Sequence, residues 1–475
     1  MNKESAVAKA KIFVCSRTIL AFASLLWPLS AAESWADTLR LEKVVNLLGI
    51  DAGAQAKASQ VGEAAVEHLV AFAIRSHPSL KVEAAQLMAR QSELEGAEGY
   101  YQPELRLAAS SAKIRAQDVL ADLKTRRDES SLSLSLSENI WRGGQDAGRV
   151  DTARQNEKIA QISQKIQLEA VAFMVRKAAL DFNYRSMRQV IDEASLADAL
   201  ELSALTERKF NAGQNGKIDI HFARMRASAA KSTAVRASIQ ARQARQLLID
   251  KLGPQLNSDE FLVDLNMLAQ RVLFFSLELP ESASEPNLSF AEQKALALQD
   301  RAKISLNQGY KQRYLPQLDL LGNVSRSLGR SWLENQTDQK IKTSHLDMNL
   351  QLQLSWNLWD QTLDHQNSAA AGEKIAAEAQ YETLHFETKA EAGRMRSYII
   401  ELQKSLLIAK DAYTEAGLLY AAQTKLFNSG LIGIQSLLDA EREQRNAIGA
   451  WHENVYELQF SLLRWQTLQR GYLAQ

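Results

Sequence analysis

The side chains able to carry out covalent chemistry are few and stand apart from one another in this chain of 475 residues. The patterns G-x-S-x-G and H-E-x-x-H are absent, as is a phosphate-binding P-loop. Four of the seven histidines lie singly, at His221, His345, His365 and His385. A lone histidine on a helix is more often a surface or core residue than a ligand. The sequence therefore predicts a protein that is not an enzyme and that binds no metal or other cofactor.

The charges balance, with 56 basic and 56 acidic residues. This balance gives no general electrostatic basis for binding nucleic acid. The only cysteine, Cys15, precedes a short apolar run over 18–29 that follows several basic residues. This layout predicts a signal peptide over 1–36, cleaved after Ala32 or Ala36, and a mature chain without disulfides. A retained membrane helix is the alternative, although the run is shorter than the roughly 20 residues that a span needs.

Two stretches alternate apolar and polar residues with a period of two. The longer one, 346–359, has Leu, Met or Trp at every second position, and an echo over 131–137 alternates leucine with serine. This spacing is typical of a strand with lipid or core on one face and water on the other. On this interpretation Asn349, Gln351 and Gln353 line water. Because no other apolar stretch could span as a helix, membrane insertion would use strands.

The chain also contains an internal duplication. Pro316 follows Pro103 by 213 residues, and Gly430 follows Gly213 by 217. Each copy has a helix, a proline-led strand pair, a long helical run, a glycine-containing turn and a returning helix. The 64 residues between Gly148 and Gly213 include neither Gly nor Pro, and as a helix they would extend about 95 Å at ~1.5 Å per residue. Such a helix needs partners along its length, which predicts a coiled coil or helical barrel.

This plan predicts the order of parts along the chain. They are a signal peptide (1–36), an N-terminal extension (37–60), a first repeat (61–252) with β-hairpin 103–141 and tip turn 210–219, an equatorial linker (253–287), a second repeat (288–471) with β-hairpin 316–359 and tip turn 427–436, and a C-terminal tail (472–475). The first helix is expected from Val61 to about Tyr101. Polar loops are expected inside the hairpins, up to Asp128 in the first and over 329–343 in the second.

Four strands in one chain are too few to form a closed barrel. An open sheet edge is not tolerated in lipid, because its backbone groups find no hydrogen-bond partners there. We therefore expect other copies of the chain to complete the sheet. Barrels of the outer membrane have even numbers of strands from about eight upward, so two, three or four copies satisfy this requirement equally.

Four local stretches, taken with the duplicated plan, resemble a known family. They are SHPSLKVEAA (76–85), YYQPELRL (100–107), FNAGQNGKIDI (210–220) and FNSGLIGIQSLLDAEREQ (427–444). Over residues 61–471 the chain resembles the TolC-like outer membrane factors of Gram-negative bacteria. The resemblance implies an α+β membrane protein: a homotrimer with a 12-stranded barrel in outer-membrane lipid, continuous with a helical tunnel across the periplasm.

The resemblance also implies a function and partners. Such channels dock with a periplasmic adaptor protein and with an inner-membrane ABC exporter or proton-driven pump. They export drugs, or polypeptides by type I secretion, and the sequence does not separate these two cargo classes. A structural periplasmic coiled-coil protein with a small soluble sheet is the alternative from a different class.

By the same resemblance, the two tip turns are where the adaptor would dock. The positions concerned are Gly213, Gln214, Asn215, Gly216, Lys217, Gly430, Leu431, Ile432 and Gly433. The glycines would let the backbone reverse and approach another helix closely. Ordinary turns between antiparallel helices are the alternative.

The family carries acidic side chains near the tips, and Asp219 and Asp439 match acidic positions of that pattern. Three identical carboxylates around a symmetry axis would repel one another, attract cations and narrow the entrance. The alternative for Asp219 is a favourable interaction with the N-terminus of its own helix. The chain departs from the family at Phe427, Ile432 and Ser436, where a tyrosine, an arginine and a second aspartate are usual. Phe427 and Ile432 would then close the entrance by apolar contact.

Three tryptophans lie near the strand ends, next to the helical pattern: Trp141, Trp356 and Trp359. Aromatic residues form girdles at both membrane interfaces of outer-membrane barrels. The sequence therefore predicts that these three contact the interface. Core packing at the junction of strand and helix is the alternative.

Overall fold

The computed structural model describes residues 52–118, 123–253, 268, 289–308, 314–333 and 341–469. The predicted signal peptide, most of the linker and the tail lie outside these residues. The described chain forms two compact units. The sheet unit comprises residues within 79–167 and 288–388, and the tip unit comprises residues within 1–78, 168–287 and 389–475.

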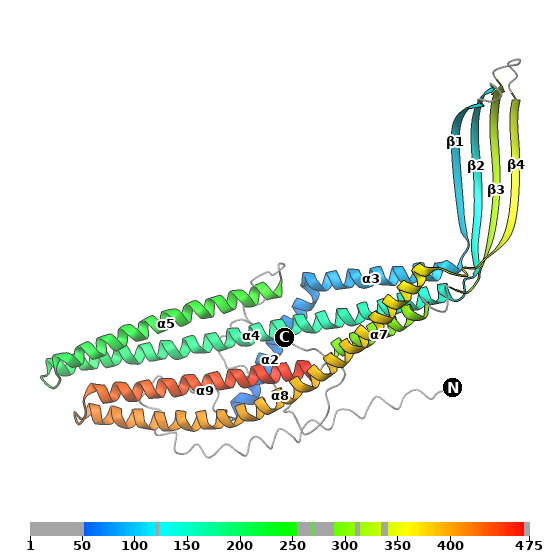
Figure 1. Ribbon diagram of the computed structural model, residues 1–475. Coiled ribbons are helices and arrows are strands. Elements are labelled where there is room, and N and C mark those ends of the chain that lie inside the picture. Colours follow the sequence, from blue (N-terminus) through cyan, green and yellow to red (C-terminus); the bar gives the residue numbers. More distant parts are fainter. Residues whose placement is uncertain are drawn as a thin grey trace, which may run out of the picture. The chain divides into compact units, whose positions relative to one another are not determined.

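Four long antiparallel strands make up the sheet of the sheet unit, as Figure 1 shows. They are β1 (Glu104–Asp118), β2 (Leu123–Trp141), β3 (Gln317–Leu333) and β4 (Ile341–Ser355), in the order β1-β2-β3-β4. Both predicted hairpins are therefore confirmed. The pairing of β2 with β3, with Leu134 opposite Val324, joins the hairpins of the two repeats into one sheet.

The strands extend into both stretches predicted as polar loops, so the predicted loop bounds are too wide, and residues 119–122 and 334–340 lie outside the described residues. Lys113 pairs with Asp128, and Gly329 pairs with Thr343. The ladder hydrogen bonds satisfy backbone groups whatever the side chains are, so a polar stretch extends a strand when its neighbour is long enough. At the other end β4 stops at Ser355, short of the predicted Trp359.

The first helix is split in two. The first piece, α2 (Ala52–Ser76), begins before the predicted Val61, so part of the predicted extension is helical. The second, α3 (Pro78–Glu98), starts at a proline, which favours the first position of a helix because its missing N–H has no partner there anyway. The hydroxyl of Ser76 donates to the carbonyl of Leu252, 3.1 Å away. This bond links the end of α2 to the end of α5 (Lys217–Leu252) inside the tip unit.

Helix α7 (Phe290–Asn307) opens the second repeat with a capping box. The backbone N–H of Ser289 donates to Glu292 Oε2 at 2.6 Å, and the N–H of Glu292 donates to Ser289 Oγ at 3.2 Å. Glu292 is only 2% exposed, and its other oxygen lies 2.8 Å from Nδ1 of His385 on α8 (Gln361–Asn428). His385 is thus partnered, but by a carboxylate that caps a helix.

The four long helices are α4 (Gln145–Asn211), α5 (Lys217–Leu252), α8 (Gln361–Asn428) and α9 (Ile434–Gln469). Short turns at the two predicted tips join α4 to α5 and α8 to α9, which confirms both helical hairpins (Figure 1). In the tip unit Met187 and Ile191 of α4 pack with Ile448 and Val455 of α9. No helix among the described residues has an apolar stretch long enough to cross a membrane.

Candidate functional site: the sheet faces and the helical tips

One face of the sheet is an apolar band. The register aligns rows of large apolar residues across the strands, such as Leu107, Leu134, Val324 and Met348. In β4 the band runs from Leu346 to Leu354, about 27 Å at ~3.4 Å per residue. Met348 and Leu350 are 72% and 74% exposed in the single chain. The width is close to the ~25 Å apolar band of outer-membrane barrels.

The opposite face is polar and mostly uncharged. One row holds Arg106, Ser135, Asn323 and Asn349, and the next on the hairpin-loop side holds Ala108, Ser133, Ser325 and Asp347. Asn349, Gln351 and Gln353 all lie on this face, because they alternate with the leucines of β4. The predicted division of each strand into apolar and polar faces is confirmed. That the polar face lines water stays a prediction.

The three tryptophans are all exposed in the single chain: Trp141 by 46%, Trp356 by 61% and Trp359 by 79%. The indole N–H of Trp356 donates to the carbonyl of Tyr314 at 2.8 Å. The hydroxyl of Tyr314 in turn donates to Asp364 Oδ1 at 2.9 Å. Burial in the core of this chain, the alternative for these residues, is not what the structure shows. Contact with a membrane interface stays a prediction.

The two tip turns share one backbone motif. Gly213 has a φ of +73°, and its N–H donates to Phe210 O at 2.9 Å. Gly430 has a φ of +76°, and its N–H donates to Phe427 O at 3.1 Å. In each turn the backbone N–H of the next residue donates to the carbonyl oxygen five positions earlier, from Gln214 to Lys209 and from Leu431 to Leu426. This is the Schellman ending of a helix, repeated in both copies.

The other two tip glycines lack this left-handed backbone conformation. Gly216 has a φ of −81°, which any residue adopts, and Gly433 is not among the described glycines with positive φ. A Cβ added at Gly433 or at Gly213 would meet nothing within 4 Å. The predicted close approach to another helix therefore does not occur within the chain.

The predicted docking positions are mostly at the surface. Gly213, Gln214, Gly216, Lys217, Gly430, Leu431 and Gly433 are exposed, whereas Asn215 and Ile432 are half-buried. Two large apolar side chains stand out there, Leu431 at 72% exposed and Ile218 at 70%. Sequence reasoning did not single out Ile218. Its apolar type directly after a tip turn was the available signal.

The predicted acidic positions are in different environments. Asp219 is half-buried, and its Oδ2 accepts the N–H of Gly216 at 3.1 Å at the start of α5. This contact is the one expected if Asp219 interacts with the N-terminus of its own helix, the alternative to pore lining. Asp439 is exposed on α9, with its Oδ1 3.5 Å from Nη1 of Arg442, and Ser436 is exposed one turn earlier. Lining of a pore by these residues stays a prediction.

Phe427 is buried and does not offer an apolar surface to other chains. Its ring is 2% exposed and packs in a cluster with Tyr420, Ile434 and Leu437, against which the half-buried Ile432 also packs. Closure of an entrance by the Phe427 ring stays a prediction, and in this conformation the ring is not exposed for such a contact. The physical reason is that the ring fills the space between α8 and α9 just before their turn.

Lys209, for which the sequence predicted no role, binds this same helix end. Its ammonium group lies 4.2 Å from the centroid of the Phe427 ring. It also donates to the carbonyl oxygens of Phe427 and, at 3.4 Å, of Asn428. A cation here satisfies C-terminal carbonyls of α8 and interacts favourably with the helix dipole. Lys209 thus ties the tip of the first repeat to the tip of the second.

A second tie lies deeper in the tip unit. Arg226 of α5 and Glu441 of α9 form a bidentate ion pair, with Nε and Oε2 2.6 Å apart. Both side chains are only 11% exposed. Arg226 also donates to Ser195 Oγ of α4 at 2.9 Å, so three helices meet at one guanidinium. Sequence reasoning missed this pair, although Glu441 belongs to one of the four family-like stretches.

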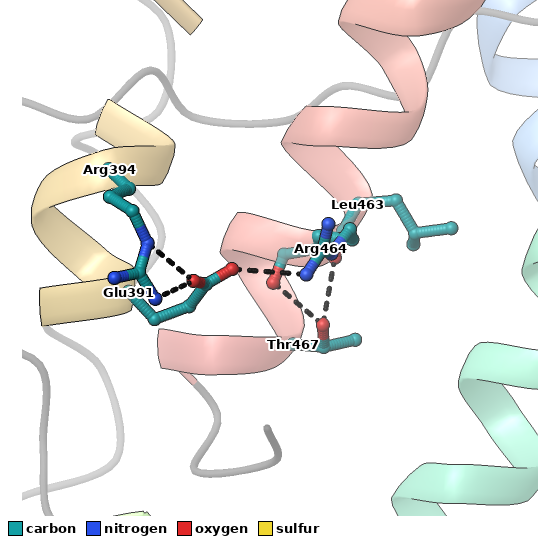
Figure 2. Close-up of polar contacts among 5 residues, drawn as sticks. All are labelled: Glu391, Arg394, Leu463, Arg464 and Thr467. Carbon is teal, nitrogen blue, oxygen red and sulfur yellow. Dashed lines mark hydrogen bonds and ion pairs between the residues drawn. The ribbon is translucent and has the colours of Figure 1, made fainter. Parts of the chain in front are cut away.

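Further from the tips, a third polar cluster joins α8 to α9. Figure 2 shows Glu391 of α8 between Arg394 and Arg464, with the Arg464 guanidinium of α9 3.0 Å from Glu391 Oε1. The hydroxyl of Thr467 donates to the carbonyls of Leu463 and Arg464. Glu391 therefore bridges the two helices of the second hairpin.

Between α4 and α9 lies a buried aromatic group. His452 stacks on Tyr184 with ring centroids 4.7 Å apart. Burial, with a smaller effect of Arg188, lowers the pKa of His452 to about 4. Burial also raises the pKa of Tyr456, whose hydroxyl donates to Asp181. Neutral His452 is a packing residue, and the described residues contain no cluster of side chains able to hold a metal ion.

The comparisons with known proteins concern the fold. No family model and no curated protein matches the chain. Solved structures do, among them the outer-membrane channel OprN, with a TM-score of 0.74 and 17% identity over 87% of this chain and 91% of that one. The CmeC outer membrane channel of Campylobacter jejuni has a TM-score of 0.70 and 14% identity, covering 86% of each chain. The outer membrane protein VceC of Vibrio cholerae has a TM-score of 0.68 and 17% identity, over 86% of this chain and 97% of that one. The expected fold of the single chain, long helices with a four-stranded antiparallel sheet, is thus confirmed, whereas the trimer and the 12-stranded barrel stay predictions.

Proposed function

We propose that this chain, which has the fold of those outer-membrane channels, is itself the outer-membrane channel of an export system in a Gram-negative bacterium. The observation that carries the proposal is the two-faced sheet. Its apolar band is exposed in the single chain, and its other face is polar. A soluble scaffold would gain nothing from a band of exposed leucines this wide, because apolar surface of that extent favours lipid or aggregation.

Closure of the sheet requires further copies. β1 and β4 form its edges, and their backbone groups need partners in lipid. Three copies would supply 12 strands, the number that the family resemblance implies, with β1 of one chain pairing with β4 of the next. The polar faces would then enclose water, with Asn349, Gln351 and Gln353 on its wall.

The helical tips would bind a periplasmic adaptor protein. Both turns present exposed backbone at Gly213 and Gly430, and Ile218 and Leu431 offer apolar anchors beside them. Anchors of this kind, surrounded by polar residues, are typical of binding surfaces. The adaptor would connect the channel to an ABC exporter or a proton-driven pump. The duct itself would be passive and would carry proteins or small molecules.

The ties in the tip unit would hold the entrance in one conformation. Lys209 binds the end of α8, and Arg226 binds α9, so each tie joins the first helical hairpin to the second. Separation of the two hairpins would break both ties and take from Arg226 and Glu441 the opposite charge that each now contacts. Opening would therefore require these contacts to be exchanged for others.

The experiment that tests the function is fractionation followed by electrical recording. The mature protein should fractionate with the outer membrane, require detergent, migrate as a heat-modifiable trimer and form ion-conducting channels in planar bilayers. Recovery of a monomer in the soluble periplasmic fraction, with no affinity for detergent, would instead support the scaffold alternative and remove the transport function.

A further inference from the structure

The apolar band has a basic border at only one end, the end at the hairpin loops. Arg326 is the first charged residue in the band, in a row with Ala109, Leu132 and Leu346. It is exposed in the single chain. A guanidinium at the edge of an apolar band extends toward the polar side of the interface, where it meets headgroups.

Beyond Arg326 the register gathers more basic residues. After one row of serines and Leu328, the next row is Lys113, Asp128, Arg330 and Lys342. The row after it contains Arg115, Arg126 and Trp332. Together with Arg326 these rows hold six basic residues and one acidic residue. We call Lys113, Arg115, Arg126, Arg326, Arg330 and Lys342 the basic border.

The alternate rows of the same stretch, which belong to the opposite face of the sheet, lack this excess of basic over acidic residues. They contain Ala112, Glu129, Gly329 and Thr343, and then Ile114, Arg127, Ser331 and Ile341. The other end of the band also lacks it, since the rows there are Glu138, Leu320 and Leu352, and then Trp141, Leu318 and Leu354. The excess of basic over acidic residues is therefore found on one face and at one end of the band.

We propose that the basic border binds the phosphate-bearing headgroups of anionic lipids in the membrane leaflet at the hairpin-loop end. The proposal rests on the proposed function, because it requires the band to lie in a membrane. Arginine and lysine bind phosphate oxygens through charge-assisted hydrogen bonds, and arginine does so with two parallel bonds. The adjoining leucines would contact the acyl chains of the same lipids. Trp332 occupies a register position suited to an interfacial aromatic residue.

A lipid fits this surface better than a free anion does. The basic border is continuous with the apolar band through Arg326, Leu328 and Leu346, so a ligand with both a phosphate and an acyl chain contacts both parts. The residues are also spread over four neighbouring strands rather than gathered around one cavity. This spacing suits several headgroups side by side.

The test compares lipid retention by the trimer. The fourfold variant K113Q/R326Q/R330Q/K342Q is compared with the wild type and with the matched control R106Q/R127Q, whose positions lie in the alternate rows. Each protein is incubated in non-ionic detergent with phosphatidylglycerol or phosphatidylcholine and repurified, and bound phospholipid is measured per chain. The wild type and the control should retain more phosphatidylglycerol than phosphatidylcholine. The fourfold variant should lose at least about fivefold of the phosphatidylglycerol, because each basic residue near an anionic surface contributes to binding.

Two further measurements separate the possible failures. Inorganic phosphate added at the same concentration should not displace the lipid, and complete displacement would show a plain anion site and overturn the proposal. Conductance in bilayers is recorded for all three proteins. Channels in all three with equal phosphatidylglycerol retention would overturn the lipid proposal alone. A wild type that forms no channel would remove the proposed function on which it rests.

Discussion

The ammonium group of Lys209 lies over the ring of Phe427, 4.2 Å from its centroid, and donates to the carbonyl oxygen of the same residue. One side chain from the first repeat thus contacts both the ring and the helix end of the second repeat. The position equivalent to Lys209 in the second repeat, 217 residues later, is Leu426. The second repeat therefore has an apolar residue where the first repeat has this lysine, although both turns have the same backbone motif.

Replacement of Lys209 by methionine should loosen the tips. The change removes the cation and the hydrogen bonds to α8 but keeps the apolar stem, and we expect a loss of about 1 kcal/mol of stability. In bilayer recordings the closed-state conductance of K209M should rise. The control is K217M, which removes an exposed lysine from the same tip. Equal conductance of K209M and the wild type would show that this contact does not hold the entrance.

Breaking the Arg226–Glu441 pair should be more costly. Each single variant, R226M or E441L, leaves a group without its partner where both side chains are 11% exposed, and we expect a loss of about 3 kcal/mol. The double variant R226M/E441L should be more stable than the sum of the single losses predicts, because no charge is left unpaired. Thermal unfolding of the four proteins in detergent measures this coupling, and strict additivity would contradict it.

The two tip glycines with positive φ should be sensitive to substitution. We expect G213A and G430A each to lose about 1 kcal/mol, because a Cβ is strained in the left-handed conformation. The matched control is G433A in the same tip, where an added Cβ meets nothing within 4 Å and no positive φ is found. Thermal unfolding should leave G433A within error of the wild type, and an equal loss for all three would contradict the explanation by φ.

Asp439 should contribute to ion selectivity if it lines the duct. Its carboxylate is exposed and only 3.5 Å from the guanidinium of Arg442 on the same helix, a contact that solvent screens. We expect D439A to reduce cation selectivity and block by multivalent cations in bilayer recordings. D411A, which removes an exposed aspartate from α8, is the control. An unchanged record for D439A would remove this residue from the lining.

His452 should make the tip unit sensitive to acid. Its pKa is about 4 in the folded chain, compared with 6.5 for an unperturbed histidine, because burial disfavours the charged ring. The contribution of neutral His452 to the free energy of unfolding is therefore fully present above pH 6.5. It is lost as the pH falls from 6.5 toward 4, by about 3 kcal/mol in all. H452F, which can still stack on Tyr184, should flatten the stability profile in this pH range, whereas H365F on the exposed face of α8 should not.

The sequence alone determined the features that depend on local geometry. A period of two separates the apolar and polar faces of a strand whatever its neighbours are, so the leucines from Leu346 onward were enough to predict a two-faced sheet. Glycine is the residue that best tolerates a positive φ, so Gly213 and Gly430 marked both helix ends. The duplication was visible because it repeats these local signals at nearly constant spacing.

Only the tertiary structure decided what depends on segments distant in the chain. The pairing of β2 with β3 extended the strands through charged stretches such as 125–128, because ladder hydrogen bonds formed there. Packing of α8 against α9 buried Phe427, which the sequence had placed at an entrance. Lys209 and Phe427 are 218 residues apart, and Arg226 and Glu441 are 215 apart. No periodicity relates such partners, since the contact exists only after separately formed helices have packed together.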